Sequence, residues 1–219
     1  MTRKLLFPWA AALAFALVSP LGASGQDALA VLESAADRYL SFESFCADFR
    51  QVVDNRILRR TIRSEGELCQ AGPDRFEMRF SDPAGDRVVA DGEHLWVYLP
   101  STDAGQVFQG GIGEAGGRFD LHSEFLSDPG ERYEPTLDGR EEVEGRPAWV
   151  LMLEPVEASP FLRARLWIDE EDHLIRRAEI TEDEGLVRTL HLDQIRLNPS
   201  ISATWFDFEP PAGAQVVRR

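Results

Sequence analysis

The chain has 219 residues, of which 43% are hydrophobic and 28% charged. This is the composition of an ordinary globular protein rather than of a disordered, collagen-like or multi-span membrane chain. Its 38 acidic residues outnumber the 23 basic ones, and the formal net charge is -15. Proteins that hold nucleic acid neutralise its phosphates with a basic surface, so this charge excludes nucleic acid as a partner. The same excess of acidic residues disfavours contact with an anionic membrane surface.

The first 25 residues have the layout of a secretory signal peptide. Two basic residues precede an apolar run over residues 5–18, and small residues follow over 19–25. We expect cleavage after Ala23 or Gly25, which leaves residues 26–219 as a single exported domain. The apolar run is too short to span a bilayer comfortably, and no cysteine near the cleavage site offers a point for lipid attachment. The mature protein is therefore predicted to be a soluble, periplasmic monomer.

The chain after the signal peptide begins with a helix and continues as strands. Apolar residues recur at intervals of three and four over residues 27–40, which predicts a helix with Asp27 as its N-cap. From Phe42 onward the period changes to two. This predicts a hairpin of two strands joined around residues 54–59.

Cys46 and Cys69 lie on the two strands of this hairpin. Thiols in an oxidising compartment tend to pair, so we expect a disulfide between them. If the two residues face each other across the hairpin, both sulfurs lie on the face opposite to Phe45, Phe49 and Leu68. Two free, buried thiols are the alternative.

Further strands follow at short spacing, separated by turn sequences. The strands are predicted over residues 75–80, 86–90, 94–99, 148–154, 163–169, 174–181 and 186–196. The turns are predicted at residues 82–85, 91–92, 138–139, 144–147 and 169–172. The stretch 110–135 interrupts the series, because a Gly-rich linker over 110–117 leads into apolar residues at helical spacing. The pattern predicts an α+β fold in which an N-terminal helix and a central helical insertion pack on one long, curved antiparallel sheet.

No motif for catalysis or metal binding stands out. Residues 111–116 fit GxGxxG, but a dinucleotide site needs a parallel βαβ unit, whereas this chain alternates strand with strand. The four histidines are isolated from one another and lack metal-ligand spacing. Carboxylates cluster over 169–172 and 182–184, where solvated turns explain them better than a calcium site or a glycosidase pair. We therefore expect no metal, no cofactor and no enzymatic activity.

Large apolar side chains occupy one face of the predicted strands. They are Phe45, Phe49, Leu68, Phe76, Met78, Phe80, Leu95, Val97 and Leu166. One interpretation is an ordinary core between a sheet and its helices. The other is a residual cavity for an apolar ligand, because a long curved sheet encloses more volume than two helices can fill. Spacing alone does not separate these two interpretations.

Four segments share their order and spacing with a known family. They are residues 45–51 (FCADFRQ), 66–68 with 73–76 (GEL and PDRF), 91–100 (DGEHLWVYLP) and 206–213 (FDFEPPAG). Together they extend over almost the whole chain after the signal peptide. In these segments the chain resembles the periplasmic lipoprotein carrier family LolA.

The resemblance implies an incomplete, eleven-stranded antiparallel half-barrel whose concave face is closed by helices around a hydrophobic cavity. The acyl chains of a triacylated lipoprotein would enter that cavity. The carrier would receive this cargo from an inner-membrane ABC-type releasing complex and pass it to an outer-membrane lipoprotein acceptor. It would need no nucleotide and perform no chemistry of its own.

The resemblance also implies a lid over residues 110–126. Its glycines would let four apolar side chains swing between filling the empty cavity and uncovering it. These are Phe119, Leu121, Phe125 and Leu126. Many family members carry an Arg before the Pro of the second segment, where it hydrogen-bonds the lid closed, whereas this chain has Gly72. That latch is therefore not expected here.

Two other functions are compatible with an exported protein of this kind. A sensor or regulatory binding module on the same half-barrel would use the cavity to report lipid to a partner protein, although such modules usually carry a second domain. An exported hydrolase would use acidic residues such as Asp172 and Glu184. The sequence predicts no buried pair of acids for that role.

Overall fold

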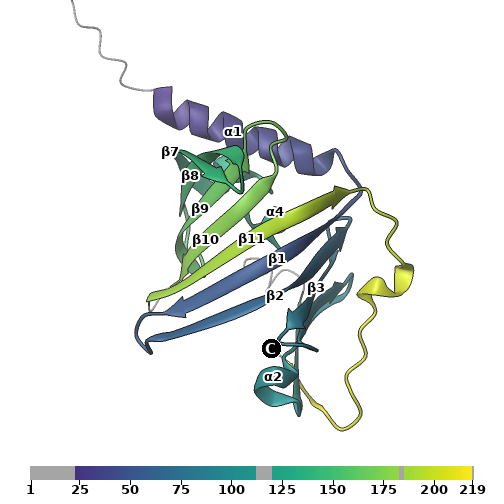
Figure 1. Ribbon diagram of the computed structural model, residues 1–219. Coiled ribbons are helices and arrows are strands. Elements are labelled where there is room, and N and C mark those ends of the chain that lie inside the picture. The colour runs from purple at the N-terminus through teal and green to yellow at the C-terminus, as the bar shows by residue number, and fades with distance from the viewer. Residues whose placement is uncertain (1–22, 112–119, 183–184, 219) are drawn as a thin grey trace, which may run out of the picture.

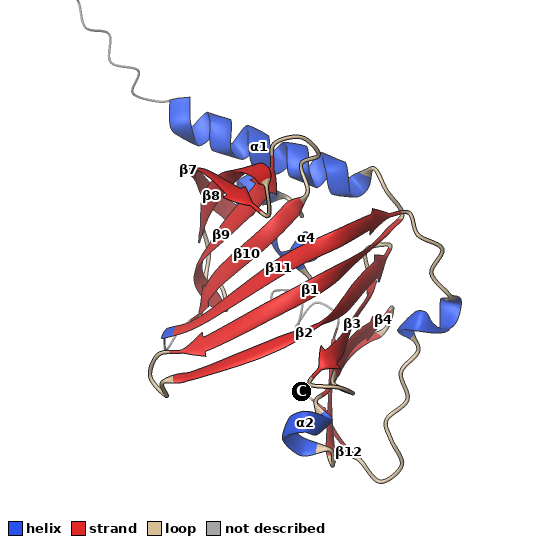
Figure 2. Ribbon diagram, in the orientation of Figure 1, coloured by secondary structure: helices blue, strands red, loops and turns tan. Residues whose placement is uncertain are grey.

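The computed structural model describes residues 23–111, 120–182 and 185–218. Most of these residues lie in strands (Figure 2). In chain order the strands are β1 (Ser44–Asn55), β2 (Arg60–Ala71), β3 (Arg75–Asp82), β4 (Arg87–Asp91), β5 (His94–Tyr98), β6 (Gln106–Gly111), β7 (Tyr133–Val143), β8 (Arg146–Pro155), β9 (Phe161–Asp169), β10 (Ile175–Glu182), β11 (Leu186–Leu197) and β12 (Gln215–Arg218). The helices are α1 (Ala23–Leu40), α2 (Pro100–Asp103), α4 (Leu121–Phe125), α5 (Pro129–Arg132) and the 3-10 turn η2 (Ala203–Phe206).

All twelve strands of the described residues belong to one sheet, in the order β12-β6-β5-β4-β3-β2-β1-β11-β10-β9-β8-β7. Neighbouring strands are antiparallel, except that β12 runs parallel to β6. The sheet is open and curved, and α1 lies across the end formed by β7 to β10 (Figure 1). The curved antiparallel sheet is thus confirmed, with one strand more than the resemblance implies.

The β1–β2 hairpin follows the predicted alternation. Cys46 pairs with Cys69 and Asn55 with Arg60, so the turn consists of residues 56–59. Antiparallel neighbours place their side chains on the same face of a sheet. The register therefore puts both cysteines on one face and Phe49 on the other.

Two of the predicted breaks are in fact parts of strands. Gly110 and Gly111, expected in a flexible linker, pair with β5 as the end of β6. The predicted turn at 138–139 is a bulge inside β7, where Gly139 has a φ of 129°. Glycine adopts this conformation without a steric penalty, and a glycine inside a strand often marks a bulge. The turn prediction was wrong because glycine marks bulges as well as turns, and the linker prediction was wrong at Gly110 and Gly111 because pairing with β5 holds these two glycines in a regular strand.

The C-terminal segment returns to the sheet far from where it leaves it. After β11 it passes through η2 and ends as β12 beside β6, as the yellow part of the chain shows in Figure 1. Gln215 pairs with Gln106 and Arg218 with Gln109. These four paired residues carry no local pattern that predicts a strand.

α1 begins earlier than predicted, at Ala23. Asp27 therefore lies inside the helix and not at its N-cap, because a cap residue must leave helical geometry. The apolar face of the helix is confirmed, since Ala28, Leu32 and Ala35 are completely buried. Among the described residues, no helix is long and apolar enough to cross a membrane. Most of the predicted signal peptide lies outside the described residues.

The two faces of the sheet bury different clusters. The inner face, defined here as the one that packs against α1 and α4, shares one large hydrophobic cluster with these helices. The opposite, outer face carries two small clusters, one at the disulfide with Phe206 and one around Trp167. Burial of a large apolar side chain contributes about 1.5–3 kcal/mol, so the inner cluster provides most of the stability of the curved sheet.

Candidate functional site

The inner face brings together all nine apolar residues predicted to line a cavity. Seven of them are buried, and Phe80 and Val97 are partly buried against the same cluster. They come from β1, β2, β3, β5 and β9, so they lie on both sides of β1 in the sheet. Phe49 meets Phe80 edge-on, with ring centroids 5.0 Å apart. The result is one continuous apolar interior.

α4 places apolar side chains of the predicted lid inside this interior. Phe125 is completely buried, and its ring centroid lies 5.6 Å from that of Phe161 on β9. Leu121 and Leu126 belong to the same cluster and are 8% and 4% exposed. Phe119 lies outside the described residues. The described lid residues therefore fill the space that the sheet and α1 enclose.

A buried carboxylate caps the start of α4. Oδ1 of Asp120 accepts hydrogen bonds from the backbone N–H groups of His122 and Ser123, at 3.0 and 3.2 Å. The second oxygen, Oδ2, accepts a long hydrogen bond of 3.5 Å from Nε2 of Gln70 on β2. Burial raises the pKa of Asp120 in spite of these donors. The cap fixes where the helix starts, since a side-chain acceptor satisfies backbone donors of the first turn.

The end of α4 is held by Glu124, which is only 6% exposed. Its Oε1 accepts hydrogen bonds from Tyr133 Oη at 2.7 Å and from Arg132 Nη2 at 3.1 Å. Arg132 Nη1 also donates to the carbonyls of Ser123 and Glu124, at 2.8 and 2.6 Å. Burial and the bond to Glu124 raise the pKa of Tyr133, so its phenol stays protonated. We call Glu124, Arg132 and Tyr133 the Glu124 clasp.

Two small hollows adjoin the apolar interior in the part of the chain that the structure describes. A pocket of about 220 Å³ opens between the end of α1, the start of β1 and α4. Its lining includes Tyr39, Phe42, Phe45, Gln70, Pro73 and His122. Deeper inside, between Phe76 and Leu121, a void of only about 10 Å³ remains. Pockets that hold drug-sized ligands measure roughly 300–1,000 Å³, so neither of these two hollows among the described residues has room for a long acyl chain.

A larger hollow among the described residues is lined mainly by charged and polar residues. It measures about 800 Å³, and charged side chains including Asp48, Arg50, Glu67 and Asp193 line it. Asp48 and Arg50 alternate along β1 with the buried Phe49, which places them on the outer face. Phe49 and Phe80 of the predicted cavity also belong to its lining, whereas the other seven predicted residues do not. This charged hollow therefore borders the apolar interior without being the predicted apolar cavity.

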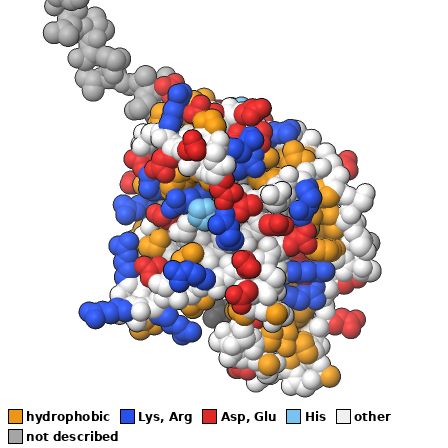
Figure 3. All heavy atoms as spheres, in the orientation of Figure 1, with side chains coloured by type: hydrophobic (Ala, Val, Ile, Leu, Met, Phe, Trp, Pro, Cys, Tyr) orange, Lys and Arg blue, Asp and Glu red, His pale blue; other side chains and the backbone are white. Residues whose placement is uncertain are grey.

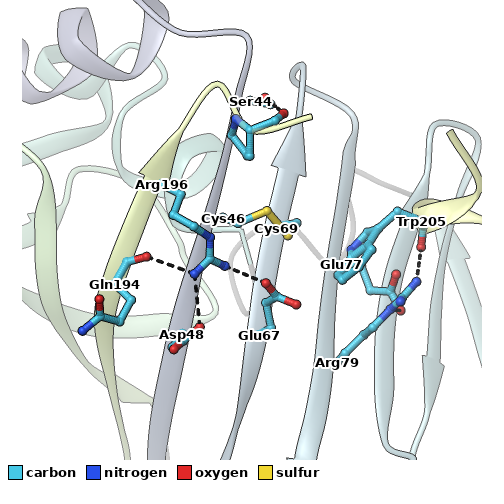
Figure 4. Close-up of a disulfide and its surroundings, with 11 residues drawn as sticks. Ser44, Cys46, Asp48, Glu67, Cys69, Glu77, Arg79, Gln194, Arg196 and Trp205 are labelled. Atoms are coloured by element: carbon cyan, nitrogen blue, oxygen red, sulfur yellow. Dashed lines mark hydrogen bonds and ion pairs between the residues drawn. A yellow bond between two sulfur atoms is a disulfide. The ribbon is translucent and has the colours of Figure 1, made fainter. Parts of the chain in front are cut away.

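The predicted disulfide joins Cys46 and Cys69 on the outer face, with their Cα atoms 4.1 Å apart (Figure 4). Phe206 covers it, and the three residues form a small buried cluster. Beside it, Arg196 forms ion pairs with Glu67 at 2.6 Å and with Asp48 at 3.6 Å. The face of the disulfide was predictable from alternation, whereas its cover was not.

Arginines of β3 and β4 hold the C-terminal segment in place over the outer face. The guanidinium of Arg79 lies 3.7 Å from the ring centroid of Trp205, and its Nη2 donates to the Trp205 carbonyl at 2.7 Å. Arg79 and Arg87 both bind the completely buried Glu77. In the motif at 206–213, Phe206 covers the disulfide and Phe208 packs on Trp96 and Tyr98 of β5, and neither belongs to the apolar cluster of the inner face.

The acidic runs at 169–172 and 182–184 contain carboxylates that form ion pairs with arginines, as far as the structure describes these residues. Asp169 is completely buried and binds Arg146 and Arg176. Burial alone would raise its pKa, but the bond from Arg146, two backbone N–H donors and the charge of Arg176 lower the pKa to about 2. A carboxylate that stays ionised cannot act as a general acid. Glu182 pairs with Arg188 at 3.2 Å, and the two acids that follow it lie outside the described residues.

Comparison with known proteins places this architecture in a family. A family model described as "Uncharacterized protein" matches residues 72–206. The outer-membrane lipoprotein carrier protein of Dechloromonas aromatica (strain RCB) is 30% identical over 178 residues, which cover 78% of this chain and 79% of that protein. The chain belongs to the outer-membrane lipoprotein carrier family. Another carrier, from Legionella pneumophila (strain Corby), is 29% identical over 179 residues, 82% of this chain and 85% of its own.

A solved structure shares the fold of this carrier-family chain. It is an uncharacterized conserved protein from Thermus thermophilus, with a TM-score of 0.58 and 18% identity. The match covers 89% of this chain and 100% of that one. At this level of identity the likeness concerns the fold alone.

Gly72, which stands where the resemblance leads one to expect an Arg, occupies a position that suits glycine. The residue lies in the turn between β2 and β3 with a φ of 67°, which strains most residues other than glycine. Its N–H donates to the carbonyl of Glu43 at 3.0 Å, which ties the turn to the start of β1. In the described residues, the side-chain bonds to α4 come from Gln70, Arg132 and Tyr133 instead. No spacing pattern in the sequence points to these three residues.

Proposed function

We propose that this protein carries acylated lipoproteins through the periplasm, with their acyl chains held against the inner face of the sheet. The observation that carries the proposal is the single apolar interior shared by both halves of the sheet, α1 and α4. Relatives named outer-membrane lipoprotein carrier proteins support the same class of cargo. The role is binding and release, with no reaction at the site.

The physical reason for a carrier is the cost of exposing acyl chains to water. Each CH₂ group removed from water contributes about 0.8 kcal/mol, so three free acyl chains are very unfavourable in solution. An apolar interior removes that cost, provided that it has room. The two hollows of the interior among the described residues measure only about 220 and 10 Å³, so we propose that movement provides the room.

α4 is the element whose displacement would provide this room. It contributes Leu121 and Phe125 to the interior but has only five residues, so most of its stability comes from contacts with the rest of the molecule. We propose that cargo replaces these side chains and that the Glu124 clasp breaks in the process. In this chain the clasp takes the part that an Arg at position 72 has in many family members.

The donor and the acceptor of the cargo follow from the family resemblance. We propose an inner-membrane ABC-type complex as the source of the lipoprotein and an outer-membrane lipoprotein acceptor as its destination. A soluble carrier that closes over acyl chains needs such partners, because the chains do not leave an apolar interior for water unaided.

Native mass spectrometry of the mature protein tests the proposal. A triacylated lipoprotein should form a one-to-one complex, whereas the same protein without acyl chains should not. Phe76→Glu should abolish the complex, because it places a charge among the acyl chains. Leu162→Glu is the control, since Leu162 is 58% exposed on β9.

Circular dichroism should accompany each variant to confirm that it is folded. If Phe76→Glu does not fold, Val97→Glu replaces it, because Val97 is only partly buried against the cluster. Equal complexes with acylated and unacylated cargo would refute acyl binding. A protein that retains only free lipid would favour the sensor function instead.

A further inference from the structure

The tip of the β1–β2 hairpin combines exposed apolar and basic side chains. Residues 56–63 read RILRRTIR, with four arginines and no acid, in a chain whose net charge is -15. Ile57 and Leu58 are 68% and 70% exposed, and Ile62 is 45% exposed. We call residues 56–63 the hairpin tip. The hairpin tip is therefore basic and apolar at its surface, whereas the chain as a whole is acidic.

Hydrogen bonds from neighbouring residues support the backbone of the hairpin tip, and its side chains are free to face solvent. The turn lies at the far end of two twelve-residue strands, away from α1 (Figure 1). Oδ1 of Asn55 accepts a hydrogen bond from the backbone N–H of Leu58 at 2.9 Å. The N–H of Arg56 donates to the carbonyl of Gly185 at 3.5 Å, which ties the turn to the start of β11. A supported turn presents Ile57 and Leu58 without a further folding step.

The arginines of the tip differ from the others in their partners. Within the described part of the chain, none of Arg56, Arg59, Arg60 and Arg63 forms an ion pair. Asp54, the nearest acid on the same hairpin, accepts a hydrogen bond from Thr61 at 3.0 Å. Basic side chains gather with apolar ones at this end of the molecule, at the lower left of Figure 3. The tip therefore has positive charge available for an external anion.

We propose that the hairpin tip docks the protein on an anionic phospholipid bilayer. Ile57 and Leu58 enter the boundary between headgroups and acyl chains, and the arginines bind lipid phosphates. Apolar residues flanked by basic ones suit this boundary, and arginine matches phosphate geometry with two parallel hydrogen bonds. Anionic lipids attract clustered basic residues, while the negative charge of the remaining surface limits contact to the tip.

A bilayer fits the tip better than a protein partner does. A stable protein interface buries about 800 Å² on each side, which requires a broad or grooved surface. The tip offers a narrow turn with two adjacent apolar side chains that project into solvent. The docking does not depend on cargo, so it goes beyond the carrier function proposed above.

Vesicle co-sedimentation of the cargo-free mature protein tests the docking. Vesicles of phosphatidylcholine mixed with phosphatidylglycerol should bind the protein, whereas vesicles of phosphatidylcholine alone should not. Raising the salt concentration should weaken the binding, because arginine–phosphate attraction is screened. The double change Arg59→Gln with Arg60→Gln should weaken binding about thirtyfold.

Matched variants separate the tip from the rest of the surface. Leu58→Ser should weaken vesicle binding, whereas Leu40→Ser should leave it unchanged, although Leu40 is 74% exposed at the end of α1, which precedes the start of β1. Arg38→Gln, next to Leu40, is the control for loss of charge. Ile57→Trp should add fluorescence that shifts to shorter wavelength with the anionic vesicles only.

Three results would overturn the docking. The wild-type protein could fail to bind anionic vesicles, it could bind both kinds of vesicle equally, or the tip variants could bind as wild type does. Loss of cargo delivery in tip variants of a protein that binds no vesicles would indicate a protein partner at the tip. Since the vesicle assay contains no cargo, none of these results supports or contradicts the proposed carrier function, which native mass spectrometry tests separately.

Discussion

At the scale of single residues, Asp169 shows how this chain uses a buried charge for stability. It ends β9, and its carboxylate binds Arg146 at the start of β8 and Arg176 on β10. Backbone N–H groups of the following turn add two further donors, at 2.9 and 3.2 Å. The residue thereby joins three neighbouring strands at one end of the sheet.

The low pKa of Asp169 predicts an acid-dependent loss of stability. Its pKa of about 2 in the folded protein lies below the value of about 3.9 expected for an unfolded chain. Its contribution is therefore complete above about pH 4 and is lost as the pH falls toward 2. Asp169→Asn should lower the free energy of unfolding by about 2 kcal/mol at neutral pH. Urea denaturation at several pH values measures both effects.

The control for this prediction is Asp37→Asn, because Asp37 is exposed on α1. That variant should unfold as wild type does. If Asp169→Asn keeps the full pH dependence of the wild type between about pH 4 and 2, other carboxylates cause the acid sensitivity.

At the scale of elements, α4 depends on its attachments. Five residues are too few for a stable isolated helix, so its position rests on the Asp120 cap, the Glu124 clasp and the burial of Phe125. Elements with few intrinsic bonds are the ones that open at low free-energy cost. α4 thus fills part of the apolar interior and can be displaced from it at a low free-energy cost.

Loosening the Glu124 clasp should expose α4 without unfolding the sheet. Tyr133→Phe removes the hydroxyl that donates to Oε1 and to the backbone carbonyl of Glu124, a loss of about 1–3 kcal/mol. Amide hydrogen exchange in α4 should become faster, while peptides from β1 and β2 should keep the wild-type rate. Unchanged exchange in α4 would show that Phe125 packing alone holds the helix.

The disulfide and the C-terminal segment form a second, independent unit on the outer face. Cys46 and Cys69 are 23 residues apart, and a bridge over a loop of this length contributes about 3 kcal/mol in the chain-entropy model. Reduction should therefore lower the melting temperature and speed exchange around Phe206, which packs on the sulfurs. A melting temperature that does not change with reductant would contradict a structural role. Phe206→Ala in the oxidised protein separates loss of the cover from loss of the bridge.

At the scale of the whole molecule, the curved sheet and its contents form one interior that is close to full. Protein interiors pack as densely as organic crystals, so acyl chains can enter only if side chains leave. The molecule is therefore suited to two exclusive occupants of the same space, its own α4 and its cargo. Changes that stabilise the cargo-free protein by improving the packing of α4 should then weaken its affinity for acyl chains.

If stability and acyl-chain affinity oppose each other, a Leu→Ala substitution in the lid should affect affinity differently from a Leu→Ala substitution in the sheet. Leu126→Ala should lower the free energy of unfolding by about 2–5 kcal/mol but strengthen binding of a fluorescent fatty acid, because it removes part of the filler. Leu192→Ala, at an equally buried position of the sheet, should lower stability without strengthening binding. Denaturation and fatty-acid titration measure the two quantities. Weaker binding in both variants would mean that α4 is part of the binding wall.

Local periodicity was enough to predict several features of the fold. Alternation from Phe42 onward predicted the β1–β2 hairpin, the face of the disulfide and the nine apolar residues of the inner face. It did so because successive side chains of a strand point to opposite faces, so the pattern assigns a face before any tertiary contact is known. The spacing of residues 27–40 predicted the apolar face of α1 for the same kind of reason.

The filling of the interior and the cover of the outer face depend on contacts between distant segments, so no local pattern predicts them. The partners of Glu124 and the cover of the disulfide join segments with no common pattern, and Gln215 pairs with Gln106 across more than a hundred residues. Glycines at 110, 111 and 139 carry one signal for a turn, a linker or a bulge, and their neighbouring strands decide which forms. Whether an apolar face encloses a cavity depends on the summed volume of side chains from distant elements. That sum exists only once the chain has folded.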